Sequence, residues 1–272
     1  MNFILGTHNS CTFGTPLSCF TYAAIPWLRN QSLTIEQQLE LGVRWFDLRL
    51  SYYNEDVYLS HTFIMNHTLD SIMKSFTEYH NLSHPIIIQM RVDWKSLSDL
   101  ATIQLLTDSV LEKYSDYFLI VNGVPDGVPS GVPDGVPDIF SATTQNKRNI
   151  LLYSSDGTIR NPYTVQKDIM PTVSLWNANS ITACESILKN LENEFDSIQK
   201  NSAKYIFPDK RMIIFDYSSY LPLSITDAQQ LTLLQKYADT IKKANICILA
   251  GNFIQTIHDT FTQLNNAPIP EM

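Results

Sequence analysis

Short apolar runs bounded by turn residues recur along the whole chain and alternate with segments in which apolar residues repeat every three or four positions. The runs that predict buried strands cover residues 3–5, 43–48, 57–59, 86–90, 150–153, 173–176, 212–215 and 246–250. Helical periodicity is found in residues 35–41, 69–80, 97–114, 181–198 and 228–243. The first of these helices has a capping box, Thr34-Ile35-Glu36-Gln37, and Gly42 ends it.

This alternation predicts the fold class. Strands that alternate with helices pair in parallel through crossover connections, and eight such strands are the number that closes a barrel. We therefore expect an α/β barrel of the TIM type. Residues 154–170 show no helical period and are interpreted as loop, so we expect the barrel to be distorted or incomplete in its second half.

One segment differs from the rest in composition. Residues 123–138 are four tandem tetrapeptides, GVPD, GVPS, GVPD and GVPD. Proline in every fourth position excludes helix, and Pro-Asp-Gly steps favour turns, so we expect an exposed loop. A chain of 272 residues that is 44% hydrophobic can bury one large core, and we expect a single domain over residues 1–272 that carries this loop as an insertion.

Charge, cysteines and hydropathy narrow the functional class. The chain has 19 basic and 27 acidic residues, and a net charge of −8 argues against a nucleic-acid partner. Cys11, Cys19, Cys184 and Cys247 have no metal-ligand spacing, so we expect reduced core residues. We expect no signal peptide, and no apolar stretch reaches the roughly 20 residues that a membrane span needs. We expect a cytoplasmic or peripheral membrane protein rather than a secreted one, and a monomer.

Polar residues follow three of the apolar runs where each predicted strand ends. Gly6-Thr7-His8-Asn9-Ser10 follows the first run, Phe46-Asp47-Leu48-Arg49 closes the second, and Ser60-His61 follows the third. Barrel enzymes place their reactive groups at strand ends. Asp47 and Arg49 are two residues apart and share one face of an extended strand, so Asp47 can orient Arg49 or a histidine. Two histidines and an arginine suggest a site that cleaves phosphodiesters.

These motifs resemble the bacterial-type phosphatidylinositol-specific phospholipase C, whose barrel begins with G-T-H-[DN]-S and carries F-D-[IL]-R on its second strand. The resemblance extends over about residues 3–95. It implies a metal-independent enzyme that needs no cofactor and releases diacylglycerol and inositol 1,2-cyclic phosphate. By the same resemblance His8 is the general base for the inositol 2-hydroxyl, His61 the general acid for the glyceride oxygen, and Arg49 stabilises charge on phosphorus.

The resemblance also assigns substrate-binding residues and shows two departures. Arg91 stands where the bacterial enzymes have a lysine near the phosphate; the alternative is a surface arginine paired with Asp93. Asn9 replaces an aspartate of the phosphate network, and Asn252 aligns with the aspartate that supports the base histidine. An amide keeps hydrogen bonding but loses charge, so both departures predict weaker catalysis.

Trp27 matches a tryptophan that the resembling enzymes place on a lipid-contacting rim helix. We therefore expect Trp27 to touch a phospholipid membrane, and its alternative role is packing in the core.

Two other functional classes stay open. A phosphoinositide-binding protein that has lost turnover fits the missing carboxylates at Asn9 and Asn252. A metal-dependent phosphodiesterase of the glycerophosphodiesterase or phospholipase D type requires a second carboxylate near Asp47, where this chain has Arg49.

Overall fold

The computed structural model describes residues 2–17, 30–79, 85–119, 149–154, 156–166, 171–175, 181–200, 211–216, 232–233, 235–241, 243, 246–251 and 258. The chain forms two compact units, one made of Asn9–Ile169 and the other of Met1–His8 with Met170–Met272. The repeats at 123–138, Cys19, Trp27 and Asn252 lie outside the described residues. The prediction of a single domain over the whole chain stays a prediction.

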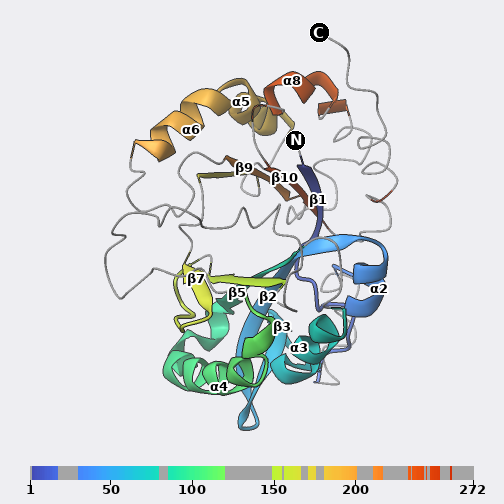
Figure 1. The fold of residues 1–272 in the computed structure, drawn as a ribbon, viewed down its shortest axis with the longest axis vertical. Helices are drawn as coiled ribbons and strands as arrows, with labels where there is room; N and C mark the ends of the chain where they lie inside the picture. The colour runs from blue at the N-terminus through green and yellow to red at the C-terminus, as the bar shows by residue number, and fades with distance from the viewer. Residues whose placement is uncertain are drawn as a thin grey trace. The chain divides into compact units, whose positions relative to one another are not determined.

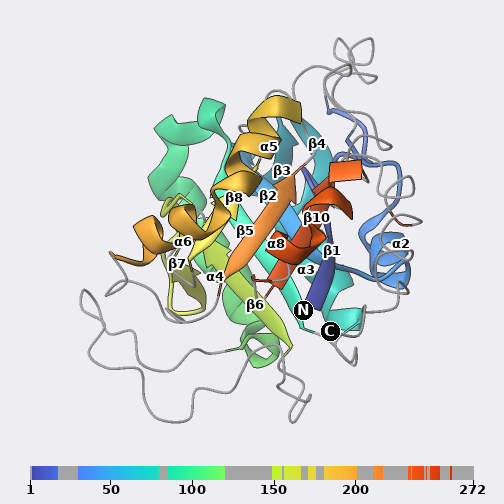
Figure 2. The ribbon, with the colours of Figure 1, turned by 90° about the horizontal axis from the view of Figure 1, so that it is seen from above.

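The Asn9–Ile169 unit is built on a parallel sheet (Figure 1). Its strands follow one another in the order β2 (Val43–Tyr53), β5 (Ile86–Val92), β6 (Ile150–Ser154) and β7 (Thr164–Gln166). Figure 2 shows β5 and β6 side by side. Nearly every residue of β5 and β6 is buried, which is the pattern of parallel strands covered on both faces.

The predicted strand at 57–59 is real, but it does not belong to the parallel series. It lies in β3 (Asp56–His61), which runs antiparallel to β2 and continues into β4 (Phe63–Thr68). Tyr53 pairs with Asp56 across a two-residue turn, Asn54-Glu55, in which both residues have positive φ. Such a turn reverses the chain at once, whereas a parallel crossover needs a dozen or more residues.

The residues predicted to be loop at 154–170 contain the short strand β7, which pairs in parallel with β6. The prediction of loop was therefore wrong at Thr164–Gln166, because three residues are too few to show the alternation that identifies a strand.

Helices in this unit follow the predicted periodicity. The capping box of α2 (Ile35–Glu40) is confirmed, since Thr34 and Gln37 exchange side-chain and backbone hydrogen bonds. α3 (Leu69–Glu78) buries the side chain of Phe76, which meets Phe46 of β2 edge to face at 4.8 Å. The predicted helix at 97–114 begins earlier, as a 3-10 helix η2 (Trp94–Asp99) that runs into α4 (Leu100–Lys113), and η3 (Ser115–Tyr117) follows.

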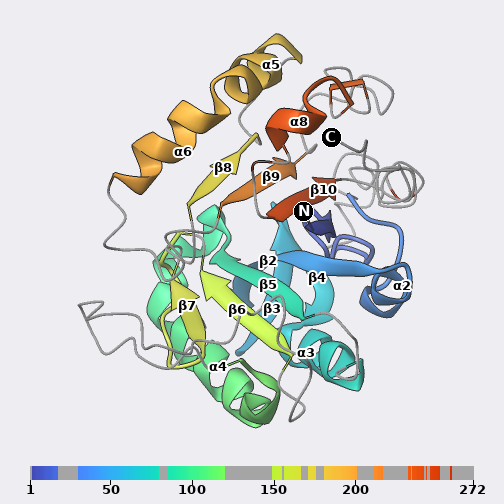
Figure 3. The same ribbon diagram turned by 45° about the horizontal axis from the view of Figure 1, so that its top comes forward.

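The other unit has its own parallel strands, in the order β1 (Asn2–Thr7), β10 (Ile246–Gly251), β9 (Met212–Asp216) and β8 (Thr172–Ser174). Figure 3 shows α5 (Ile181–Lys189), α6 (Leu191–Gln199) and α8 (Ala238–Ile241) beside β8 and β9. The predicted helix at 181–198 is interrupted at Asn190, a residue type that forms helix poorly. Leu188, Phe195 and Cys247 belong to one hydrophobic core.

The described cysteines confirm the expectation of reduced core residues. Cys11, Cys184 and Cys247 are free and buried. Burial raises the pKa of the Cys247 thiol, because the charged thiolate is poorly solvated in an apolar surrounding. None of the described helices has both the length and the apolar character required to cross a lipid bilayer.

Candidate functional site

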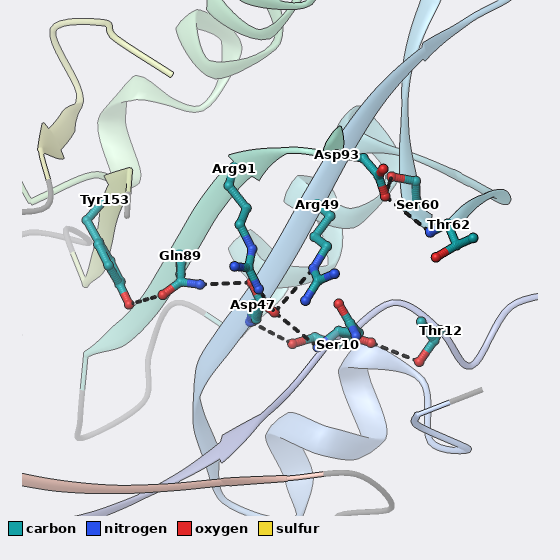
Figure 4. Close-up of polar contacts among 11 residues, drawn as sticks. Ser10, Thr12, Asp47, Arg49, Ser60, Thr62, Gln89, Arg91, Asp93 and Tyr153 are labelled. Carbon is teal, nitrogen blue, oxygen red and sulfur yellow. Dashed lines mark hydrogen bonds and ion pairs between the residues drawn. The ribbon is translucent and has the colours of Figure 1, made fainter. Parts of the chain in front are cut away.

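Asp47 is the centre of a buried polar cluster in the Asn9–Ile169 unit (Figure 4). Its Oδ1 accepts a hydrogen bond of 2.9 Å from Nε2 of Gln89, and its Oδ2 accepts one of 3.0 Å from Nη2 of Arg91. Nε of Arg49 lies 3.7 Å from the same Oδ2. The Asp47 side chain has no exposed surface, so these two guanidinium groups supply the charge that a buried carboxylate needs.

Strand register explains why these side chains meet. In the parallel pair of β2 and β5, Asp47 stands opposite Gln89 and Arg49 stands opposite Arg91. Residues two apart on a strand point to one face, so the four polar side chains form a block on a single face of the two strands. Arg49 and Arg91 keep 12% and 23% of their side-chain surface exposed, whereas Asp47 keeps none.

A relay of hydrogen bonds supports Asp47 from behind. Nε1 of Trp45 donates to the hydroxyl of Tyr153 at 3.1 Å, and this hydroxyl donates to Oε1 of Gln89 at 2.5 Å. Gln89 then donates to Asp47. The sequence analysis did not identify Gln89 and Tyr153 as site residues. The signal available for Gln89 was its position two residues before Arg91 on β5, which places both side chains on one face.

Replacing Tyr153 with phenylalanine is expected to lower the free energy of unfolding by about 1–2 kcal/mol, because it leaves a buried indole N–H and a buried amide oxygen without this partner. Urea denaturation measures the change. The matched control is Tyr163→Phe, which removes a hydroxyl bonded to the exposed Glu112 and should change stability much less. Equal losses in the two variants would contradict the relay.

The segment after His8 forms a tight turn against Asp47. Oγ of Ser10 accepts the backbone N–H of Asp47 at 2.8 Å, and the N–H of Ser10 donates to the carbonyl of Asp47 at 2.9 Å. The N–H of Asn9 points to the Asp47 carboxylate at 3.4 Å, with Asn9 at φ 46°, a left-handed conformation that asparagine tolerates well. The two predicted motifs therefore meet, because Asn9 and Ser10 of the first motif form hydrogen bonds with Asp47 of the second.

Thr12 holds the same turn from the other side. Its hydroxyl donates to the carbonyl of Asn9 at 2.9 Å and accepts the backbone N–H groups of Asn30 and Gln31 at 2.9 and 3.0 Å. Nε2 of Gln38 donates to the carbonyl of Ser10 at 2.9 Å, so α2 also fixes the turn. Cys11 lies inside it, and burial, with a smaller effect of Asp47, raises the pKa of its thiol well above its usual value. A thiol in this state is a poor nucleophile.

His61 is the last residue of β3 and lies in a sharp turn that hydrogen bonds to Asp93 stabilise. Oδ2 of Asp93 accepts hydrogen bonds from Oγ of Ser60 at 3.1 Å and from the N–H of Thr62 at 3.2 Å. Thr62 has φ 68°, an uncommon conformation for a β-branched residue, and such strain persists only where surrounding contacts impose it. The predicted alternative for Arg91, a surface pair with Asp93, is not the arrangement seen, because Arg91 is paired with Asp47.

Replacing Asp93 with alanine is expected to lower the free energy of unfolding by about 2–4 kcal/mol, because three donors lose a charged and buried acceptor. Turnover should fall as well, since the turn that carries His61 is no longer fixed. Asp99→Ala is the control, as this carboxylate accepts only an exposed bond from Ser98 among those described. An Asp93 variant with the stability of the Asp99 variant would refute the role given to Asp93.

The remaining predicted site residues are His8, Trp27 and Asn252. His8 directly follows β1 in the other unit and is 4% exposed. Trp27 and Asn252 lie outside the described residues, so their roles stay predictions. Within the described ranges, no three His, Cys, Asp or Glu side chains are close enough together to hold a metal ion.

Comparison with known proteins identifies the fold. The chain is similar to the phosphatidylinositol-specific phospholipase C of Listeria monocytogenes, with a TM-score of 0.60 and 18% identity over 95% of this chain and 91% of that one. It is similar to the Staphylococcus aureus enzyme with a TM-score of 0.54 and 14% identity, over 94% and 91% of the two chains. The chain has the fold of the bacterial phosphatidylinositol-specific phospholipases C. This phospholipase C fold confirms the predicted α/β barrel class.

Sequence comparison adds a short match. Over 69 residues, 25% of this chain, the protein is 30% identical to a PI-PLC X-box domain-containing protein of Dictyostelium discoideum. The match spans 9% of that relative's length. No family model matches the chain. The phospholipase C fold therefore rests on the structural likeness, and the short match agrees with it.

Proposed function

We propose that this protein is a metal-independent phosphodiesterase that cleaves phosphatidylinositol, or a related phospholipid or glycolipid anchor, into diacylglycerol and inositol 1,2-cyclic phosphate. One observation carries the proposal: in a chain with a phospholipase C fold, Arg49 and Arg91 converge on the buried carboxylate of Asp47 and keep part of their surface exposed. Two positioned guanidinium groups are suited to bind a phosphodiester and to stabilise its five-coordinate transition state.

In the proposed reaction His8 removes the proton of the inositol 2-hydroxyl, and that oxygen attacks phosphorus. The bond from phosphorus to the glyceride oxygen breaks, and His61 protonates the leaving oxygen. His8 directly precedes Asn9 in the chain, and the N–H of Asn9 points to the Asp47 carboxylate. Asp47 acts as a positioning residue, since it orients both cations rather than contacting substrate.

The surroundings of Asp47 support the proposed metal independence. A metal-dependent phosphodiesterase would need the carboxylate oxygens as ligands, together with a second acid. Here both oxygens accept hydrogen bonds, from Gln89 and Arg91, and Arg49 stands where the second acid would be. The guanidinium groups supply the positive charge that a metal ion would otherwise bring to the phosphate.

The substrate of this reaction is a membrane lipid, so we propose a phospholipid surface as the partner, with Trp27 as one contact and with Asn9 and Asn252 in the substrate network. Diacylglycerol release from phosphatidylinositol vesicles tests the function. Release that is the same in excess EDTA and in calcium supports the proposal. Release that requires calcium would point to the metal-dependent class. Binding of the head group without any release would point to a binding protein.

A further inference from the structure

Two large apolar side chains are exposed on η2, the 3-10 helix that starts directly after β5. Trp94 is 67% exposed and Leu97 is 50% exposed. Trp94 is three residues beyond Arg91 in the sequence, at the carboxyl end of β5. Exposed tryptophan and leucine side chains that lie beside one another usually mark an interaction surface. The position of this pair, next to the cluster of Asp47, connects the surface with the proposed reaction.

Lys95 adds a positive charge to these residues. Its ammonium group lies 5.3 Å from the ring centre of Trp94 and 5.0 Å from that of Phe63, a residue of β4. We call Phe63, Trp94, Lys95 and Leu97 the η2 patch. The neighbouring acid, Asp93, is 3% exposed, and its oxygens accept hydrogen bonds from the protein itself. Within the η2 patch the charge is therefore the positive one of Lys95, although the whole chain has a net charge of −8. The other acid of this helix is Asp99 at its end, whose carboxylate accepts a hydrogen bond from Ser98.

This composition fits a phospholipid bilayer better than a protein partner. Tryptophan is favoured where an apolar region meets water, and its indole N–H can stay near the head groups while the ring is buried. Leucine enters the acyl region, and a lysine at the same depth is attracted to lipid phosphates. The charge that complements the lipid phosphates comes from Lys95, which follows Arg91 by four residues in the sequence.

We propose that the η2 patch docks this protein on the surface of a phospholipid bilayer and holds the carboxyl end of β5 against it. The proposal rests on the proposed function, because it names the surface that would present the lipid substrate. Asp93 makes the connection rigid: it accepts the N–H of Lys95 at the start of η2 and the N–H of Thr62 beside His61. Docking of the patch therefore also places the His61 turn near the membrane.

The test compares the removal of the patch with the removal of an exposed apolar side chain elsewhere in the same unit. The double variant W94A/L97S removes the patch, and Leu105→Ser removes a leucine that is 70% exposed on α4. Sedimentation with vesicles of phosphatidylcholine and phosphatidylinositol measures binding, and urea denaturation verifies that each variant folds. We expect vesicle binding to fall at least about tenfold in W94A/L97S and to stay unchanged in Leu105→Ser. Lys95→Glu should weaken binding to the anionic vesicles and leave folding intact.

Other outcomes separate this inference from the proposed function. Three results would overturn the inference. The variant W94A/L97S could bind vesicles as the wild type does, the two apolar variants could lose binding equally, or the wild type could fail to bind vesicles. Turnover of a short-chain phosphatidylinositol that stays monomeric in solution should be unaffected by W94A/L97S. If the wild type binds through the patch but releases no diacylglycerol, the proposed function fails and the docking surface stands.

Discussion

Replacing His61 with alanine is expected to lower the turnover of phosphatidylinositol about 10²–10⁴-fold, the contribution that a positioned general acid makes. His8→Ala should cause a loss of similar size, because the 2-hydroxyl then keeps its proton. Both variants should unfold at nearly the urea concentration of the wild type. The double variant should be little worse than either single one, since a base and an acid that act in one step are not additive.

His67→Ala is the control for this pair. His67 lies on β4, and its ring packs against that of Phe13 at 4.5 Å. Burial lowers the pKa of His67, which is the behaviour of a structural histidine kept neutral. We expect His67→Ala to reduce stability and to spare turnover. Turnover above about a tenth of the wild-type value in His61→Ala would contradict a general acid at this position.

Asp47→Asn is expected to lower both the stability and the turnover of the protein. The amide cannot neutralise Arg49 and Arg91, and its NH₂ group would face a donor of Gln89 or Arg91. Breaking a buried ion pair by removing one partner costs about 3–5 kcal/mol, and we expect a loss near the lower value because Arg91 is partly exposed. Urea denaturation measures the stability, and turnover should fall together with the orientation of the arginines.

The matched control is Asp70→Asn. Asp70 pairs with Lys113 at 3.1 Å, and both side chains are about half exposed, with relative exposures of 43% and 58%. An exposed pair of this kind contributes about 0–1 kcal/mol, so the change should hardly affect stability or turnover. An Asp47→Asn variant as stable and active as Asp70→Asn would refute the central position of Asp47.

The sequence was informative where local patterns decide the structure. The capping box at Thr34 and Gln37 predicted the start of α2, and buried runs predicted most of the parallel strands. The two-residue spacing of Asp47 and Arg49 predicted that their side chains share one face of a strand, whereas the contact of Asn9 with Asp47 was not predicted.

Other features depend on tertiary pairing, which a pattern does not contain. The hairpin of β2 and β3 turns at Asn54-Glu55 without the glycine that usually marks such a turn, so its second strand looked like a member of the parallel series. Gln89 and Tyr153 became recognisable only when the register of β5 and β6 placed them opposite each other. The hydrogen bond between Asp93 and Thr62 joins residues 31 positions apart, so the sequence pattern did not reveal it. Asp93 was therefore considered only as a partner for the nearby Arg91.

Phosphorus NMR of phosphatidylinositol dispersed in detergent, incubated with the protein in excess EDTA, tests the central claim most directly. A signal of inositol 1,2-cyclic phosphate is expected to appear with the wild type and to be absent with His8→Ala. A product that lacks the cyclic phosphate would contradict attack by the inositol 2-hydroxyl. The same cyclic product from His8→Ala would contradict His8 as the base.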